Sequence, residues 1–271
     1  MIGDRVAFLP LCYFLILFYM RKFLILLVVS MLSVSGASAQ CSTENKVVPA
    51  EGETLKYGAY FNWGAIWVKG GEAIFKAEQV GNYLHFAVNA YTMPKWRWIY
   101  DLNTSIEAYM NRLNMKPVSF ASNTFEDDKE VHEKITYLHG KLKYQVWNDS
   151  IQNMRTVEVE HPDCSYDLLN AVYASRNVDY SKFAIGEQIP FNVFFTEKMS
   201  TIMGEVLGRE NVKARSGKIY NCLKCKSNSI AHTIFDPKQP VYVWITDDDR
   251  HIPVKVECKI KLGYIKVYLE E

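Results

Sequence analysis

Short runs of large apolar residues alternate with polar segments over most of the chain. From Thr54 onward, stretches rich in Tyr, Phe, Trp, Val and Ile recur at intervals of about 8 to 14 residues, separated by Gly, Asn, Asp and Pro. This spacing is typical of an all-β protein and predicts about twelve strands. The clearest are Leu55–Phe61, Glu72–Gln79, Tyr83–Tyr91, Arg97–Leu102, Ser105–Asn111, Pro117–Phe125, Glu130–Leu138, Leu142–Trp147, Phe191–Thr196, Lys218–Lys224, Val241–Thr246 and Val254–Lys261, with Tyr264–Leu269 closing the chain.

Several joins between these segments have the composition of tight turns. They include Val80-Gly81-Asn82, Glu126-Asp127-Asp128 and His139-Gly140. Tight turns connect antiparallel neighbours. We therefore expect a mainly β fold, either a curled antiparallel sheet or a half-open β-barrel.

One segment departs from the alternating pattern. Helical spacing is shown by Leu168, Leu169, Val172 and Tyr173. We expect one mid-chain helix near residues 163–177, with Asp163 or Ser165 capping its first turn.

Two of the expected strands are apolar on both faces. In one, Phe191, Val193 and Phe195 alternate with Phe194; in the other, Val241, Val243 and Ile245 alternate with Tyr242 and Trp244. Both faces must then be covered, by the helix and the curl of the sheet or by an apolar ligand in the concavity. Under the second interpretation, the candidate cavity lining is Phe191, Val193, Phe195, Tyr242 and Trp244.

The N-terminus has the three regions of a secretory signal peptide. Arg21 and Lys22 precede the apolar run Phe23–Val29, and Ala37 and Ala39 supply the small side chains that cleavage requires. We predict a signal peptide over residues 1–39, with Met20 as the real start of translation. A linker over 40–52 and a single β domain over 53–271 follow. The chain is then exported to the periplasm or the outer-membrane periphery of a Gram-negative bacterium. Gln40 directly before Cys41 argues against a lipid anchor at that cysteine.

The charge balance excludes one class of partner. The chain carries 31 Lys and Arg residues against 30 Asp and Glu residues, and the basic residues do not cluster. Because binding to the phosphate backbone needs a clustered positive excess, we expect no nucleic-acid partner.

The cysteines offer two kinds of chemistry. Cys222 and Cys225 have the spacing of a redox or zinc half-site, but on a regular strand they point to opposite faces. A disulfide from Cys258 to Cys222 or Cys225 is the alternative, since the last strands are expected to pair and exported proteins can be oxidised.

Other catalytic and metal signatures are weak or absent in the sequence. Residues 247–249 are three consecutive aspartates, which fit either a calcium site or a hairpin turn. The sequence has no Gly-x-Ser-x-Gly elbow and no glycine-rich phosphate loop. We therefore predict no catalytic residue, no metal and no cofactor, and a protein that is not an enzyme.

Four tryptophans also allow two interpretations. Trp63, Trp67, Trp96 and Trp98 could form an aromatic platform for a sugar or a lipid headgroup. Aromatic residues in strands more often fill a core, and we expect that role here.

A set of short motifs extends from about Glu51 to the C-terminus. They are Glu51-Gly52-Glu53, Leu55-Lys56-Tyr57, Gly64, Gly70-Gly71-Glu72-Ala73, Tyr166-Asp167-Leu168-Leu169, Arg176, Gly186-Glu187, Ile234-Phe235, Val243 to Asp248, Arg250, Ile252-Pro253-Val254 and Gly263 to Leu269. In these motifs the chain resembles the family catalogued as domain of unknown function 3108. The resemblance implies exported envelope proteins without an assigned reaction. The expected shape is similar to that of periplasmic lipoprotein carriers, an analogy of fold alone.

These observations lead to a functional hypothesis and an alternative. The first is a non-enzymatic envelope protein that binds a lipid or another apolar molecule in the concavity of its sheet. The alternative is a structural or protein-interaction module whose exposed edge strands pair with another envelope protein. The sequence does not define an oligomeric state.

Overall fold

The structure, a computed structural model, describes residues 49, 52–63, 66–149, 152–195, 197–228, 239–260 and 263–270. The predicted signal peptide, nearly all of the predicted linker and Cys41 lie outside these residues. In the described part, no helix is long and apolar enough to cross a membrane.

Fifteen strands of the described residues join one sheet. The first eight are β1 (Glu53–Trp63), β2 (Ile66–Val80), β3 (Tyr83–Thr92), β4 (Leu102–Asn111), β5 (Pro117–Glu126), β6 (Lys129–Tyr137), β7 (Lys141–Asn148) and β8 (Arg155–Glu160). The remaining strands are β9 (Ser165–Tyr166), β10 (Gln188–Phe195), β11 (Lys198–Lys213), β12 (Ile219–Ser227), β13 (Val241–Thr246), β14 (Pro253–Ile260) and β15 (Gly263–Leu269).

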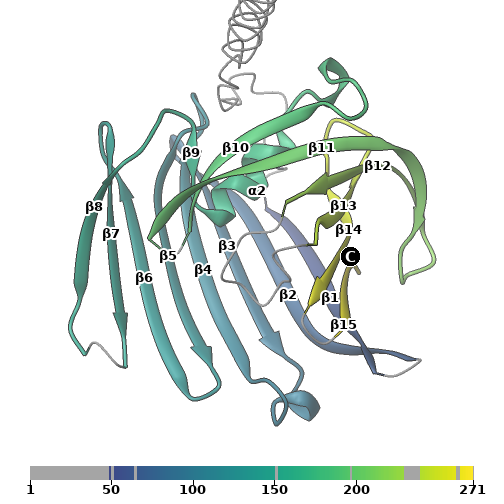
Figure 1. The fold of residues 1–271 in the computed structure, drawn as a ribbon, viewed down its shortest axis with the longest axis horizontal. Helices are drawn as coiled ribbons and strands as arrows, with labels where there is room; N and C mark the ends of the chain where they lie inside the picture. Colours follow the sequence, from purple (N-terminus) through teal and green to yellow (C-terminus); the bar gives the residue numbers. More distant parts are fainter. Residues whose placement is uncertain are drawn as a thin grey trace, which may run out of the picture. The chain divides into compact units, whose positions relative to one another are not determined.

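The sheet consists of two meanders, a first of β1 to β8 and a second of β9 to β15, which are joined where β1 pairs with β15. Its order is β8-β7-β6-β5-β4-β3-β2-β1-β15-β14-β13-β12-β11-β10-β9, and Figure 1 shows β8 to β1 side by side. Every neighbouring pair is antiparallel except β9 and β10, as the tight turns predicted. Because β15 pairs with β1, the last strand of the chain lies in the middle of the sheet.

Alternation of apolar and polar residues sets the inner face. On β3, Leu84, Phe86 and Val88 are buried while His85 and Ala87 between them are less so. The same alternation on β4 to β7 gives one large inner cluster, so each strand contributes every second side chain to the core.

Side chains bring the two ends of the sheet together. The rings of Tyr144 on β7 and Phe194 on β10 are 5.4 Å apart, and Arg155 on β8 forms an ion pair with Glu197 in the β10–β11 turn. Shifts of register interrupt several strands, including one at Val206/Gly208 on β11. Such bulges bend a strand and increase its twist, which helps the sheet to curl.

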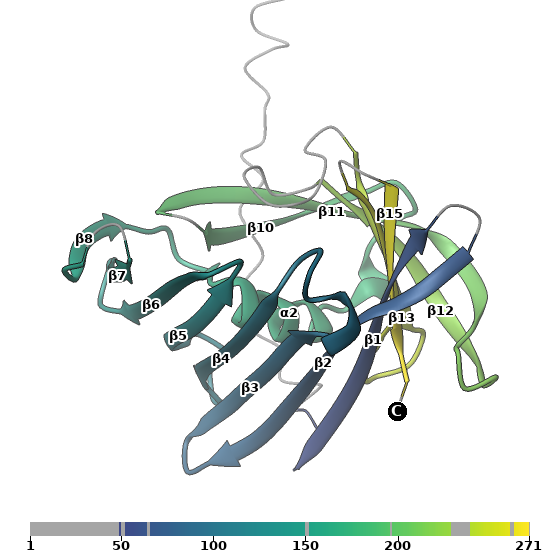
Figure 2. The same ribbon diagram turned by 90° about the horizontal axis from the view of Figure 1, so that it is seen from below.

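Helix α2 (Leu168–Arg176) packs between the two meanders. It contacts β4, β9 and β10, and Figure 2 shows it against the inner side of the curled sheet. Asp167 caps the helix by accepting a hydrogen bond from the backbone of Asn170. The expected caps, Asp163 and Ser165, are wrong, because Ser165 already belongs to β9.

The predicted fold class is confirmed, but the strand count was too low. The segment Arg97–Leu102 is mostly a loop that leads into β4, and its aromatic residues imitated a strand pattern. Strands β8, β9 and β11 were missed. In β11, Gly204 and Gly208 and several polar residues hide the alternation.

Candidate functional site

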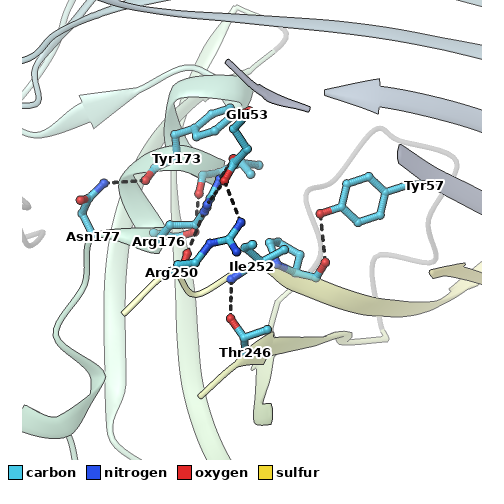
Figure 3. A network of polar contacts seen from close by, with 11 residues as sticks. Glu53, Tyr57, Tyr173, Arg176, Asn177, Thr246, Arg250 and Ile252 are labelled. Atoms are coloured by element: carbon cyan, nitrogen blue, oxygen red, sulfur yellow. Dashed lines mark hydrogen bonds and ion pairs between the residues drawn. The ribbon is translucent and has the colours of Figure 1, made fainter. Parts of the chain in front are cut away.

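A buried ion pair fixes α2 to the rest of the domain. The guanidinium of Arg176 donates to both carboxylate oxygens of Glu53, from Nη1 at 2.6 Å and from Nη2 at 3.0 Å. Both side chains are almost fully buried, and the guanidinium lies 5.4 Å from the ring centre of Tyr173 (Figure 3). A two-point contact of this kind gives a buried charge a defined geometry.

The same network reaches the turn between β13 and β14. Arg176 Nε donates to the carbonyl of Arg250 at 3.1 Å, and Arg250 Nη2 lies 3.5 Å from Glu53. The Thr246 hydroxyl accepts from the backbone N–H of Ile252 (Figure 3). Helix α2, strand β1 and the β13–β14 turn are therefore held by a single set of polar contacts.

This network explains part of the resemblance noted in the sequence. Glu53, Arg176 and Arg250 come from its front, middle and C-terminal segments and meet here, while Tyr57 donates to the carbonyl of Pro253 at 2.9 Å. The Glu53–Arg176 pair is satisfied and enclosed, which is the arrangement of a structural contact.

The outer face of the second meander arranges charge differently. Lys224 and Lys255 lie over the ring of Trp244, at 5.1 and 4.0 Å from its centre. The Trp244 indole N–H donates to Glu210. The sequence analysis expected the Trp244 ring to be covered by the helix and the curl of the sheet or by a ligand. In the structure, the two lysines and their neighbours cover it instead.

A pocket of about 490 Å³ lies beside this face, where the β11–β12 turn meets the outer side of β2 and β15. Its lining consists of Trp67, Lys213, Ala214, Arg215, Ser216, Gly217, Lys266 and Tyr268, which we call the basic aromatic pocket. The turn closes with Gly217 at φ +89°, a conformation that glycine adopts without steric cost.

Three cations and no carboxylate line the basic aromatic pocket. Lys266 lies 4.4 Å from the ring centre of Trp67 and 3.7 Å from Glu257, which it shares with a second lysine. Lys213 and Arg215 are exposed, and neither has a carboxylate within ion-pair distance among the described residues. These two charges are available to an anion.

Aromatic rings hold the Arg215 side chain in place. Its guanidinium lies 4.2 Å from the ring centre of Tyr60 and 5.4 Å from that of Tyr268. The Tyr60 hydroxyl in turn donates to Glu270 at 2.8 Å, and Glu270 pairs with Lys69 at 2.7 Å. The guanidinium is thereby positioned without being neutralised.

A carboxylate close to this group is held ionised. Lys69 donates to Glu72 at 2.6 Å, and the Tyr91 hydroxyl is a second donor. These two hydrogen bonds lower the pKa of Glu72 to about 2. Lys69 is therefore occupied by Glu72 and Glu270, which leaves anion binding to the other three cations.

The residues proposed to line a central cavity do not come together. Phe191, Val193 and Phe195 lie on β10, whereas Tyr242 and Trp244 lie on β13, with β11 and β12 between the two strands. The registers place the β10 residues on the face of Val241, opposite to Tyr242 and Trp244. Helix α2 packs on the inner, concave face of β3 to β7 and covers it.

The expected opposite orientation of Cys222 and Cys225 agrees with their neighbours. Cys222 packs with Trp244 and Val254, whereas Cys225 packs against the cluster of Ile189. Burial raises the pKa of both thiols to about 11, so they stay protonated at neutral pH.

The structure does not contain the disulfide considered for Cys258. Cys222, Cys225 and Cys258 are free thiols, while Cys164 is disulfide-bonded. Strand β13 separates β12 from β14, so the strands that carry these cysteines are not neighbours. Strands two positions apart are about 9.5 Å from each other, beyond the reach of a disulfide.

The aspartate run contacts residues of the fold. Asp247 pairs with Arg209 at 2.7 Å, and Asp248 accepts from the Thr246 hydroxyl at 2.6 Å. No group of three His, Cys, Asp or Glu residues in the described part could hold a metal ion.

Sequence reasoning missed the basic aromatic pocket. The run from Lys213 to Lys218 contains three basic residues around a glycine and was the one local signal available. Trp67 and Lys266 come from distant segments, and only the pairing of β15 with β1 and β1 with β2 brings them near each other.

Comparison with known families assigns the chain to one of them. The family described as "Protein of unknown function (DUF3108)" matches residues 56–270. The chain belongs to this family. The match covers both meanders and α2, which confirms the resemblance drawn from the sequence.

A solved structure shares the fold of this DUF3108 chain. The crystal structure of a "Beta-barrel-like Protein of Domain of Unknown Function DUF1849 from Brucella abortus" is 10% identical, with a TM-score of 0.55 over 83% of this chain and 98% of that one. This likeness supports the barrel-like sheet alone. No curated protein matches the sequence.

Proposed function

We propose that this chain is a non-enzymatic, exported protein of the bacterial cell envelope that binds an anionic amphipathic molecule. The observation that carries the proposal is the basic aromatic pocket, where Lys213 and Arg215 have no carboxylate partner among the described residues. Exposed cations next to aromatic rings provide charge and apolar surface at one place.

The location rests on the N-terminal sequence. Arg21, Lys22, the apolar run and Ala37 and Ala39 have the order that export requires. An envelope contains many molecules that join an anionic headgroup to an apolar part. The position of the ligand differs from our first expectation, because α2 fills the concave face of the first meander.

The pocket favours an anion such as a phosphate monoester. Arg215 can donate two parallel hydrogen bonds to phosphate oxygens, and Lys213 and Lys266 can add single charged donors. The rings of Trp67 and Tyr268 offer contact to an attached apolar or sugar group.

Isothermal titration calorimetry with dodecyl phosphate below its micellar concentration tests this proposal. We expect saturable binding to the parent chain, much weaker binding of dodecyl maltoside, and an affinity about tenfold lower in a Lys213→Ala/Arg215→Ala variant. Equal affinity of parent and variant would remove the pocket from consideration.

A matched variant controls for net charge. Lys116→Ala/Lys141→Ala also removes two exposed positive charges, but these lysines pair with Asp163 at 3.4 Å and Glu158 at 3.8 Å. We expect this variant to bind like the parent. A parallel loss would show that overall charge, rather than the pocket, attracts the probe.

An edge strand supports a second candidate function, that of a protein-interaction module. Among the described residues β8 pairs only with β7, so its other edge can accept a strand. In an edge strand alternate N–H groups point outward, so either Thr156→Pro or Val157→Pro removes an outward donor. Native mass spectrometry after gentle purification would show a stoichiometric partner lost in one of these variants and kept in the other.

A further inference from the structure

The connection between β3 and β4 displays large apolar side chains on its surface. It includes the short helix η1 (Pro94–Trp96) and continues as Arg97-Trp98-Ile99-Tyr100. Trp98 is 75% exposed and Ile99 is 45% exposed. The tryptophan expected in a core is thus among the most exposed apolar residues of the described chain.

This loop is ordered by contacts at its base. The indole N–H of Trp96 donates to the carbonyl of Lys69 at 2.9 Å, and the Trp96 ring packs edge-to-face on Phe61 at 5.3 Å. On the other side, Asp101 and Asp127 exchange two hydrogen bonds at 2.9 Å. Trp98 is therefore presented on a fixed support, which lowers the entropy lost on binding.

The polar atom of Trp98 is already satisfied. Its indole N–H donates to the carbonyl of Lys95 at 3.1 Å. The exposed ring therefore needs no further hydrogen-bond partner when it leaves water, and its transfer to an apolar medium is governed by its apolar area.

Neighbouring hairpins extend the apolar surface. Phe125, at the end of β5, is 39% exposed, and Ile66, at the start of β2, is 61% exposed. The β1–β2, β3–β4 and β5–β6 connections lie at one end of the sheet, because these strands form a meander (Figure 1). We call Ile66, Trp98, Ile99 and Phe125 the apolar rim.

Charges around the apolar rim nearly cancel. The basic residues are Lys95, Arg97 and Lys129, and the acidic ones are Asp101, Glu126, Asp127 and Asp128. Arg97 lies 3.5 Å from Asp101, and the Tyr100 hydroxyl donates to Glu126 at 2.6 Å. A partner recognised through a strong charge of either sign does not fit this surface.

We propose that the apolar rim inserts into the interface of a lipid bilayer, with Trp98 and Ile99 as the principal inserting side chains. The rim side chains come from three turns at the end of the sheet, so their contact with a fluid bilayer requires no matching groove. Tryptophan also favours the depth of the lipid headgroups. The balanced charge implies that zwitterionic lipid is sufficient. This inference does not depend on the basic aromatic pocket.

Cosedimentation with phosphatidylcholine vesicles tests the inference. The experiment uses the protein purified from its own host, with whatever N-terminal processing takes place there. In a Lys213→Ala/Arg215→Ala background, where the basic aromatic pocket cannot add affinity for an anionic lipid, we expect binding that neither added phosphatidylglycerol nor moderate salt changes substantially. Trp98→Ala/Ile99→Ala should weaken the partition by about tenfold or more, because two large apolar contacts are lost. Trp98→Phe should bind almost like the parent.

A second readout locates the inserted ring. Brominated phosphatidylcholine quenches tryptophans that enter the bilayer, so Trp98→Phe should keep binding and lose most of the quenching. The matched control is Leu113→Ala, since Leu113 is 72% exposed at the opposite end of the sheet, in the β4–β5 turn. Full binding by Trp98→Ala/Ile99→Ala, equal loss in Leu113→Ala, or binding that requires phosphatidylglycerol would each overturn the inference.

Discussion

Arg176, on the inner side of the curled sheet, and Arg215, on its outer side, both lie beside tyrosine rings. They differ in that the charge of Arg176 is paired with a carboxylate and that of Arg215 is not. Arg176 is 3% exposed and makes two hydrogen bonds to Glu53. Arg215 is exposed, and no carboxylate of the described residues pairs with it. A guanidinium that is buried and paired stabilises the fold, whereas one that is positioned and unpaired can meet a ligand.

The two regions should therefore respond differently to mutation. Around Arg176, substitutions should change the free energy of unfolding. Around Lys213 and Arg215, they should change ligand affinity and leave stability nearly unaltered. Three measurements can break or sharpen this contrast.

The largest effect is expected for Arg176→Ala. Removing the guanidinium leaves the Glu53 carboxylate buried, with only the more distant Arg250 near it at 3.5 Å. We expect the free energy of unfolding to fall by about 3–5 kcal/mol, measured by urea denaturation with circular dichroism.

A double variant separates the lost pair from the stranded charge. In Glu53→Gln/Arg176→Met, neither partner remains charged, so part of the stability should return. If Arg176→Ala costs less than about 1 kcal/mol, the network would not be the main link between α2 and β1.

The second prediction concerns Asp167 at the start of α2. Burial raises the pKa of this carboxyl from 3.8 to about 6, although the backbone and side chain of Asn170 donate to it. The folded chain thus holds the proton up to about pH 6, while the unfolded chain releases it near pH 3.8. The resulting stability is fully present below about pH 4, falls as the pH rises from 4 through 6 and is absent above that range, a change of about 3 kcal/mol.

Asp167→Asn tests that pH dependence. An amide keeps an acceptor for the helix cap but does not ionise, and Asn170 Oδ1, which lacks a hydrogen-bond partner, can accept from it after a flip. Between pH 4 and 7.5, the unfolding free energy of the parent should fall relative to that of the variant. Parallel curves would show that Asp167 titrates normally in the folded chain.

A feature could be predicted from the sequence when the residues that form it are close together along the chain. Strand β3 was predictable, because Leu84, Phe86 and Val88 alternate within five residues. The segment Arg97–Leu102 was misassigned because a loop that exposes Trp98 has the same apolar composition as a strand. Propensity reports what a residue favours locally and carries no information about which side of it meets water.

The basic aromatic pocket could not be predicted, for a related reason. Trp67 follows the first hairpin turn, Arg215 lies in the β11–β12 turn and Lys266 is in the last strand. Their proximity depends on the pairing of β1 with β15 and on the course of a long hairpin. The total charge is balanced, and the run from Lys213 to Lys218 was the one local sign that unpaired cations gather at this place.

The smallest change in stability, and the sharpest contrast with Arg176, is expected for Lys213→Ala. Lys213 is exposed on the last residue of β11 and has no carboxylate partner among the described residues, so its removal should alter the unfolding free energy by less than about 0.5 kcal/mol. The affinity for dodecyl phosphate should nevertheless fall by about fivefold, because one charged donor leaves the pocket. Lys141→Ala, which removes a lysine paired with Glu158, should alter neither quantity. A loss of stability with unchanged affinity in Lys213→Ala would reverse the assignment and make the outer cations part of the fold.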